Sequence, residues 1–211
     1  MTLKVSSTPG LRIAGPDDID LVADLITDSF AHLPVIHYLV PEPGRRPAVV
    51  RQWYRLYVAH AVGGAGQVVI TDDGLGAAVW FDRTGQASEP DDYAKHLIDL
   101  AGEYLDRFDH LDAQMDAHHP ADPHWHLLFL AVHPSRWSHG YGSALMAHTH
   151  ERLDKAGIAA YLEATSERNA ALYRRHGYQD MTPPTIGVTG DIDLYRMWRP
   201  PQTRDHRPMP L

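Results

Sequence analysis

Two glycines two positions apart, Gly140 and Gly142, lie where an apolar run passes into a run of helix-forming residues. The apolar run is LLFLAV (127–132), and the helix-forming run is SALMAHTHERLDKAG (143–157). The first turn of a helix has unpaired backbone N–H groups that favour an anion, and glycine lets the backbone approach that anion. The spacing therefore admits two interpretations: a tight turn and nothing more, or a backbone cradle for a phosphate.

The residues around the glycines exclude two common phosphate-binding motifs. A P-loop needs Gly-Lys-Ser or Gly-Lys-Thr at its end, which the sequence lacks here. A dinucleotide fingerprint needs a third glycine three residues further on, where the sequence has Leu145. A pair of glycines alone is weak evidence for anion binding, so the choice depends on residues elsewhere.

The elements that position this loop follow from hydrophobic periodicity. Helices are expected over 16–31, 48–62, Tyr93–Ala117, 143–156 and 169–176. Strands are expected over 11–15, 125–132, 159–165 and 192–198, with a hairpin over 67–82 and a loop over HYLVPEPGRRP (37–47). The uninterrupted apolar run at 125–132 indicates a central strand that is covered on both faces. This order of elements predicts a single α/β or α+β domain around a mixed sheet, over residues 11–199. Residues 1–10 are predicted to be a flexible N-terminus, and 200–211 a proline-rich tail.

Composition narrows the class of protein. The chain has 211 residues, a formal net charge of −8 and no cysteine. The negative charge argues against binding nucleic acid through phosphate contacts, and it suits a cationic small substrate better. The missing cysteines exclude disulfides and thiolate chemistry and fit a reducing cytoplasm. No apolar run is long enough to span a membrane, and the N-terminus lacks the apolar core of a signal peptide.

Two motifs together resemble the GCN5-related N-acetyltransferase (GNAT) superfamily. The first runs from the strand through Val132 and Pro134 to Gly140 and Gly142. The second consists of Asn169, Leu172, Tyr173, Gly177 and Tyr178. The resemblance covers residues 11 to 198. The layout is most similar to the puromycin N-acetyltransferase group in its segments AAVWF (77–81), HPADPHW (119–125) and LEATSERN (162–169). It implies the GNAT fold, with a twisted central sheet, splayed central strands and flanking helices.

The resemblance implies acetyl-CoA as co-substrate and transfer of its acetyl group to an amine by direct attack. The residues it assigns to the cofactor are Leu130, Ala131, Val132, Trp137, Ser138, His139, Gly140, Tyr141, Gly142, Ser143, Asn169 and Tyr173. Most of these contacts would come from backbone N–H groups. One position departs from the family pattern: Trp137 stands where glutamine or arginine is usual, with Arg136 just before it. We expect binding to survive this change with lower affinity.

The same resemblance assigns Tyr173 as the acid that protonates the leaving thiolate, against the alternative of a buried packing aromatic. Asn169, at i−4, would bind the cofactor and also act as a helix cap. An alkyl amine with a pKa near 10 is neutral in about one part in a thousand at pH 7, so a base is needed. Glu163 and His126 both fit that role, and both could instead be structural residues. An already neutral amine would need no strong base.

The acceptor is expected to be an amine of a small molecule such as an antibiotic or another natural product, with a role in resistance or tailoring. Phe30, Tyr38 and Trp80 are the candidate acceptor-binding residues, because the N-terminal elements line the acceptor side in this fold. Alternatives are acetylation of a protein N-terminus or lysine, and a non-catalytic CoA-binding module. The histidines at 118, 119, 124 and 126 cluster without a typical ligand spacing, so no metal site is expected. A monomer or homodimer is expected.

Overall fold

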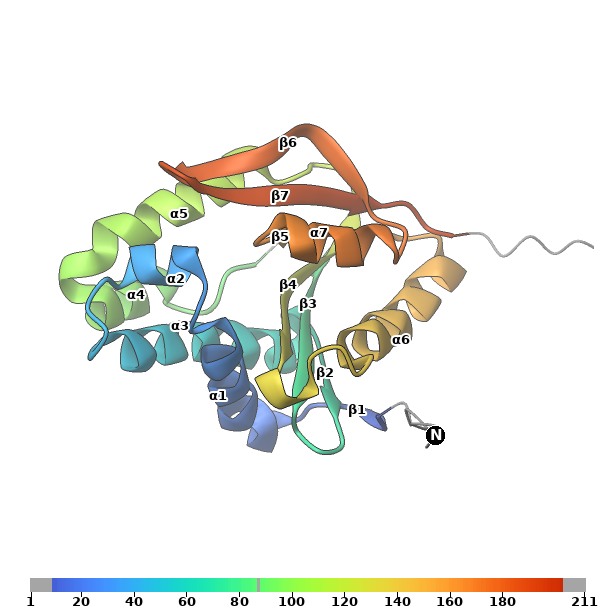
Figure 1. Ribbon diagram of the computed structural model, residues 1–211, viewed down its shortest axis with the longest axis horizontal. Helices are drawn as coiled ribbons and strands as arrows, with labels where there is room; N and C mark the ends of the chain where they lie inside the picture. Colours follow the sequence, from blue (N-terminus) through green and yellow to red (C-terminus); the bar gives the residue numbers. More distant parts are fainter. Residues whose placement is uncertain (1–8, 87, 203–211) are drawn as a thin grey trace, which may run out of the picture.

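The apolar strands around the glycine loop form one mixed sheet in a computed structural model that describes residues 9–86 and 88–202 (Figure 1). The seven strands lie in the order β1-β2-β3-β4-β5-β7-β6, and only β4 and β5 pair in parallel. Their bounds are β1 Leu11–Ile13, β2 Gly66–Thr71, β3 Gly76–Arg83, β4 His124–Val132, β5 Ala159–Ala164, β6 Gln179–Thr189 and β7 Ile192–Arg199. The expected single domain with a mixed sheet and a central strand at 125–132 is thereby confirmed.

The helices cover the two faces of the sheet unequally. The first five are α1 Ile19–Phe30, α2 Pro34–Leu39, α3 Arg46–His60, α4 Tyr93–Ala101 and α5 Leu105–His118. They share one apolar cluster with one sheet face, as Figure 1 shows by their position on one side of the molecule. The other two helices, α6 Tyr141–Ala156 and α7 Glu167–Arg174, pack with the opposite face. The sheet therefore separates the expected acceptor side from the glycine loop at the start of α6.

An irregularity in β4 shapes the middle of the sheet. Phe129 pairs with Val79 and Leu127 pairs with Trp80, so Leu128 is an extra residue in β4, a β-bulge. The bulge changes which residues face each side: His126 and Phe129, three positions apart, both line the α1–α5 side. Pairing between β4 and β5 also ends at His126. Beyond that point the two central strands separate, in agreement with the splayed strands that the GNAT resemblance implies.

Three expected elements differ from the structure. Residues 37–39 were expected in a loop but belong to α2, which begins at Pro34, a favourable first helical residue, and buries Val35, Ile36 and Leu39. The single helix expected over Tyr93–Ala117 is broken at Gly102, whose φ of +54° leaves the helical region. Strand β6 was not expected, because its prolines and largely exposed side chains hide the alternation of an edge strand.

The expected termini lie mostly outside the described residues. The flexible segment 1–10 has only residues 9 and 10 within them, and the proline-rich tail 200–211 only residues 200–202. Within the part that the structure describes, none of the helices has the length and apolarity needed to cross a membrane.

A buried ion pair joins the C-terminal hairpin to α6. Arg199, with 5% of its side chain exposed, donates two hydrogen bonds of 2.7 and 2.8 Å to the carboxylate of Asp154. The Arg199 guanidinium holds the pKa of Asp154 below its usual value. Paired hydrogen bonds of this kind fix geometry as well as charge. The pair therefore anchors the end of β7 to the helix that carries the glycine loop at its other end.

Replacement of Arg199 by methionine is expected to lower the free energy of unfolding by about 3 kcal/mol, because it leaves the Asp154 carboxylate without its partner. Chemical denaturation at neutral pH measures the change. The adjacent Lys155→Ala removes an exposed pair with Glu151 and should cost less than about 0.5 kcal/mol. Equal losses in the two variants would contradict the role given to the buried pair.

Candidate active site

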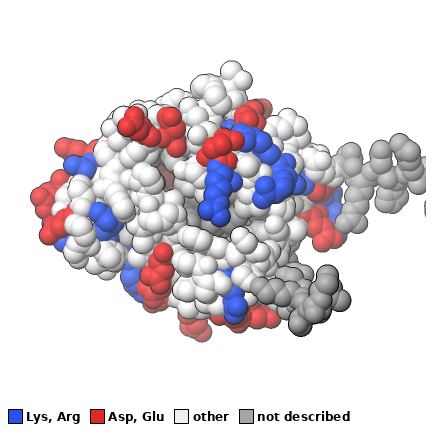
Figure 2. All heavy atoms as spheres, in the orientation of Figure 1, with Lys and Arg blue, Asp and Glu red and all other residues white. Residues whose placement is uncertain are grey.

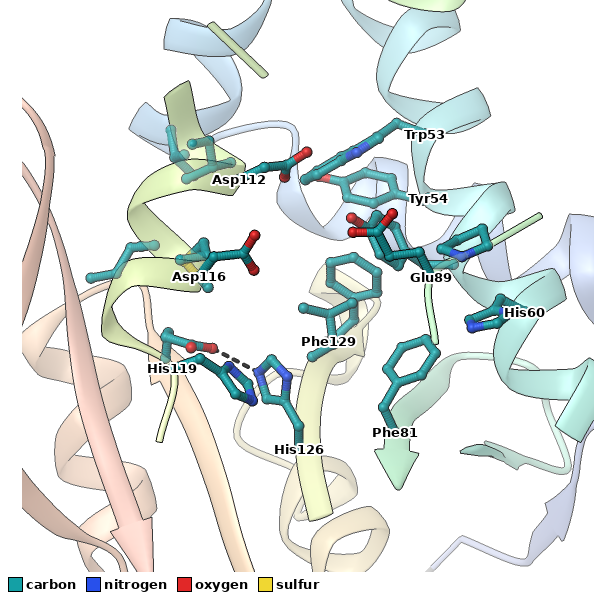
Figure 3. A pocket seen from close by; sticks show the side chains of 18 of the residues that line it. Trp53, Tyr54, His60, Phe81, Glu89, Asp112, Asp116, His119, His126 and Phe129 are labelled. Atoms are coloured by element: carbon teal, nitrogen blue, oxygen red, sulfur yellow. Dashed lines mark hydrogen bonds and ion pairs between the residues drawn. The ribbon is translucent and has the colours of Figure 1, made fainter. Parts of the chain in front are cut away.

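A cavity of about 200 Å³ lies between α1–α5 and the sheet (Figure 3). Aromatic side chains form most of its wall, from α1, α3, α4 and the central strands: Phe30, Trp53, Tyr54, Tyr57, Phe81, Tyr93 and Phe129. Their rings pack edge to face, for example Tyr54 on Phe129 with centroids 5.1 Å apart. Interlocked rings of this kind make a rigid wall, so the cavity is preformed and its surface is largely apolar.

The two expected bases meet at the floor of this cavity. His126 Nε2 lies 2.8 Å from Glu163 Oε2, and the two side chains are only 4% and 5% exposed. They come from β4 and β5, at the point where the two strands stop pairing. A dashed line in Figure 3 marks this contact. What the sequence offered as two alternative bases is in the structure one hydrogen-bonded pair.

The pair determines which nitrogen of the His126 imidazole carries the hydrogen. Burial by itself would raise the pKa of Glu163, but the charge and hydrogen bond of His126 outweigh it and lower that pKa. Glu163 is therefore ionised and can only accept, so His126 donates through Nε2–H. In neutral His126 the lone pair then lies on Nδ1, which is buried and has no hydrogen-bond partner within the described residues. A buried acceptor nitrogen beside a ligand cavity can take a proton from a bound amine.

Two neighbouring histidines add no charge to this floor. His119 lines the cavity with its ring 5.0 Å from that of His126, and burial lowers its pKa to about 3. His124 donates from Nδ1 to the Asp122 carbonyl and shares a 3.2 Å contact between Nε2 atoms with His119. Both are thus neutral near pH 7. No group of three or more histidine, aspartate or glutamate side chains in residues 9–86 and 88–202 could hold a metal ion.

Carboxylates occupy the other end of the cavity. Asp112 and Asp116 project from α5, one turn apart, and Glu89 approaches from the loop before α4 (Figure 3). Burial, followed by the charges of its acidic neighbours, raises the pKa of Asp112 to about 6, although a hydrogen bond from Tyr93 opposes the shift. No sequence pattern indicates these residues, because their distance from the reacting end depends on the break at Gly102.

The glycine loop has the geometry of an anion cradle. Gly140 is the N-cap of α6 with a φ of +83°, and a Cβ at this position would meet nothing within 4 Å. Ala144 donates to Gly140 O, so the N–H groups of residues 141–143 precede the helical hydrogen bonds. Basic side chains gather over α7 on the same face (Figure 2), where the sequence has Arg168, Arg174 and Arg175. The open backbone and positive charge fit the pyrophosphate of a coenzyme A molecule.

Trp137, the departure from the family pattern, ties this loop to the central strand. Its indole Nε1–H donates to the carbonyl of Val132, the last residue of β4, at 2.8 Å. Its ring stays 44% exposed and packs against His32, with centroids 5.6 Å apart. Arg136 is turned towards Asp73, 3.7 Å away. At this position the loop is thus held to β4 by a neutral indole, where the family usually has a polar or basic side chain.

The remaining expected cofactor residues lie along α7. Ser166 is the N-cap and accepts from Asn169 N, so the cap role expected of Asn169 is wrong. The Asn169 side chain instead donates from Nδ2 to Thr165 Oγ1 at 3.0 Å, and Thr165 lines the cavity. Tyr173, one turn on, packs against Tyr178, and burial raises its pKa. Asn169 therefore stands between the acceptor cavity and the expected acid.

The three expected acceptor-binding residues are placed differently from one another. Phe30 lines the cavity. Tyr38 lies outside it, with Arg107 over its ring at 5.3 Å. Trp80 is a correction: it is fully buried on the opposite face of the sheet, where it packs against His150. Side chains alternate along β3, so Phe81 faces the cavity and its neighbour Trp80 cannot.

The comparisons with known proteins agree with this geometry. The model of the acetyltransferase (GNAT) domain matches residues 102–180. A Corynebacterium glutamicum protein described as a histone acetyltransferase and related acetyltransferase is 27% identical, with a TM-score of 0.71 over 94% of this chain and 99% of that chain. A mosquito arylalkylamine N-acetyltransferase-like protein is 16% identical, with a TM-score of 0.60 over 90% and 98%. The PaiA N-acetyltransferase from Thermoplasma acidophilum, solved with coenzyme A, is 11% identical, with a TM-score of 0.56 over 92% and 99%.

The chain therefore has the fold of the GCN5-related N-acetyltransferases and matches their domain model over residues 102–180, as its two motifs implied. It is an acyltransferase that uses acetyl-CoA as its acetyl donor.

Replacement of Trp137 by phenylalanine should weaken acetyl-CoA binding. The variant keeps an aromatic ring beside His32 but loses the hydrogen bond to Val132, worth about 1 kcal/mol or roughly a fivefold rise in Kd. Thermal unfolding with and without acetyl-CoA measures the loss as a smaller stabilisation. Trp198→Phe, in β7, is the matched control. Equal stabilisation of the two variants by acetyl-CoA would show that the hydrogen bond from Trp137 to Val132 does not support acetyl-CoA binding.

Replacement of Asp112 by asparagine should stabilise the fold near neutral pH. The pKa of Asp112 is about 6 in the folded protein against an ordinary 3.8, so its ionised form is disfavoured above both values. After allowance for solvent screening this costs about 1–2 kcal/mol. The gain should fade as pH falls through 6 and vanish below about 4, where both states are protonated. Denaturation curves at two pH values test it, and a pH-independent gain would contradict it.

Proposed function

We propose that this enzyme acetylates the amine of a small molecule bound in the aromatic cavity, with the buried pair of His126 and Glu163 as its base. The observation that carries the proposal is the unpartnered Nδ1 of His126 at the floor of a preformed cavity. Acetyl-CoA supplies the acetyl group as a thioester. Antibiotics and other natural products with an amine belong to this class of acceptor, in keeping with the puromycin-like layout.

The acceptor amine arrives at neutral pH as an ammonium ion, which cannot attack a carbonyl carbon. Deprotonation of an alkyl ammonium costs about 4 kcal/mol at pH 7. His126 Nδ1 takes this proton, and the ionised Glu163 stabilises the resulting imidazolium through the 2.8 Å contact at Nε2. Tyr173, which burial keeps protonated, holds a proton at its hydroxyl for the leaving sulfur. As the nitrogen–carbon bond forms, the carbon–sulfur bond breaks and the Tyr173 hydroxyl protonates the sulfur. The second proton lost by the nitrogen restores that hydroxyl.

The glycine loop and the strand before it are the expected cofactor site. Residues 141–143 offer backbone N–H groups to the pyrophosphate, and Asn169 offers its side chain beside the thioester end. Leu130, Ala131 and Val132 lie in the part of β4 beyond its pairing with β5, where an extended pantetheine arm can run along the strand. This arrangement brings the acetyl group to the gap between the strands, next to His126.

The aromatic lining of the cavity favours a small acceptor over a protein acceptor. Acetylation of a lysine or a protein N-terminus, the alternative, requires a rim that admits a peptide on both sides of the reacting amine. Here the wall is a set of interlocked aromatic rings backed by the helices α1–α5. Catalytic turnover with free amines would also exclude a non-catalytic CoA-binding module.

Thiol release from acetyl-CoA with a panel of alkyl amines tests the proposal. His126→Gln should lower kcat/KM about 100-fold or more, the usual contribution of a positioned base. Glu163→Gln still accepts from Nε2–H but loses its charge, so a smaller loss of about 10-fold is expected. The exposed His148→Gln is the matched control. With an aniline, which is neutral at pH 7, the loss in His126→Gln should shrink.

Two outcomes would contradict the proposal. Turnover of alkyl amines that survives His126→Gln unchanged would show that another group takes the proton. Acetylation of peptides with no turnover of any free amine would move the assignment to a protein acceptor.

A further inference from the structure

One carboxylate at the far end of the cavity, that of Asp112, is held by a hydrogen bond to only one of its oxygens. Tyr93 donates from its hydroxyl to Asp112 Oδ2 at 2.8 Å. That hydroxyl accepts in turn from Trp53 Nε1 at 3.1 Å and from the Tyr57 hydroxyl at 3.0 Å. No hydrogen bond or ion pair within residues 9–86 and 88–202 engages Asp112 Oδ1. The carboxylate is thus oriented on one oxygen and open on the other.

The charges that act on this end are negative. Those acting on Asp112 are Asp116, Asp109 and Glu89, and Asp116 and Glu89 also line the cavity. The arginine of the lining, Arg83, lies instead towards the reacting end, where its charge lowers the pKa of His119 and His124. The cavity is therefore polarised along its length, with carboxylates at one end and the His126 floor at the other.

Four further polar atoms of the lining residues are buried and have no hydrogen-bond partner in the part of the chain that the structure describes: the Tyr54 hydroxyl, Arg83 Nε, His126 Nδ1 and Glu163 Oε1. Buried polar groups without a partner are costly. Their presence in the wall of one cavity is in keeping with a polar ligand.

We propose that the acceptor carries a second cationic group, which Asp112 binds while the reacting amine lies at His126. The aromatic wall between the two ends fits an apolar segment joining the two nitrogens, and its ring faces also favour a cation. The substrate class is thus a diamine, or an amine with a distant guanidinium or ammonium. This inference rests on the proposed function, because it assigns the ligand of the same cavity.

Matched amines test the inference. The probes are p-xylylenediamine against p-ethylbenzylamine, and straight-chain alkane diamines against alkyl monoamines of equal length. The members of each pair differ only in a terminal ammonium in place of a methyl group. The diamine should have a kcat/KM about 10- to 100-fold higher, as expected for a hydrogen bond to a buried charged group. The advantage should lie mainly in KM, since the second cation does not react.

Asp112→Asn should remove the preference, with a far larger loss of kcat/KM for the diamine than for its paired monoamine, because the amide oxygen still accepts from Tyr93 but carries no charge. Asp109→Asn, on the same helix but outside the cavity, is the control for the change in net charge and should keep the preference. Equal kcat/KM for the paired amines, or a preference that survives Asp112→Asn, would overturn the inference.

A binding measurement with p-xylylenediamine distinguishes failure of this inference from failure of the proposed function. If no amine releases thiol, the proposed function fails, and thermal stabilisation by p-xylylenediamine then decides the inference alone. The diamine should stabilise the parent and Asp109→Asn more than Asp112→Asn. An equal midpoint shift in all three proteins would overturn it.

Discussion

The hydrogen bond between His126 and Glu163 joins the two central strands where their backbone pairing ends. Below it β4 and β5 form a parallel ladder, and beyond it they separate. Separation frees the β5 side of β4 for the cofactor, and the bulge at Leu128 turns Phe129 into the acceptor cavity. This contact at the fork therefore lies where the proposed cofactor site and the aromatic cavity adjoin.

The sequence predicted the parts of this site that carry a local signal. The glycine loop, Asn169 and Tyr173 could be found because a turn, a helix face and a family motif each leave a spacing that can be read. Glu163 and His126 could be named but not joined. They are 37 positions apart, and their contact depends on the register of two strands that pair over only three residues.

Other features could not be predicted from the sequence, because they depend on how the elements pack against one another. Trp80 and Phe81 are neighbours of similar character, and only the direction of β3 determines which of them faces the cavity. Strand β6 lacks the alternation of a typical strand, since its prolines and exposed side chains reflect its place at the sheet edge. Asn169 and Ser166 are equally good N-cap residues, and Ser166 is the cap because α7 already begins at Glu167.

The break at Gly102 has a consequence for how this enzyme can change. A continuous helix would carry Tyr93 and Asp112 far apart along one axis, whereas the left-handed turn folds α5 back beside α4 so that their side chains meet. Both helices lie between β3 and β4, and outside the glycine loop and α7. Under the proposed function, acceptor selectivity therefore depends on a segment that can lengthen, shorten or exchange residues while His126 and Glu163 keep their geometry.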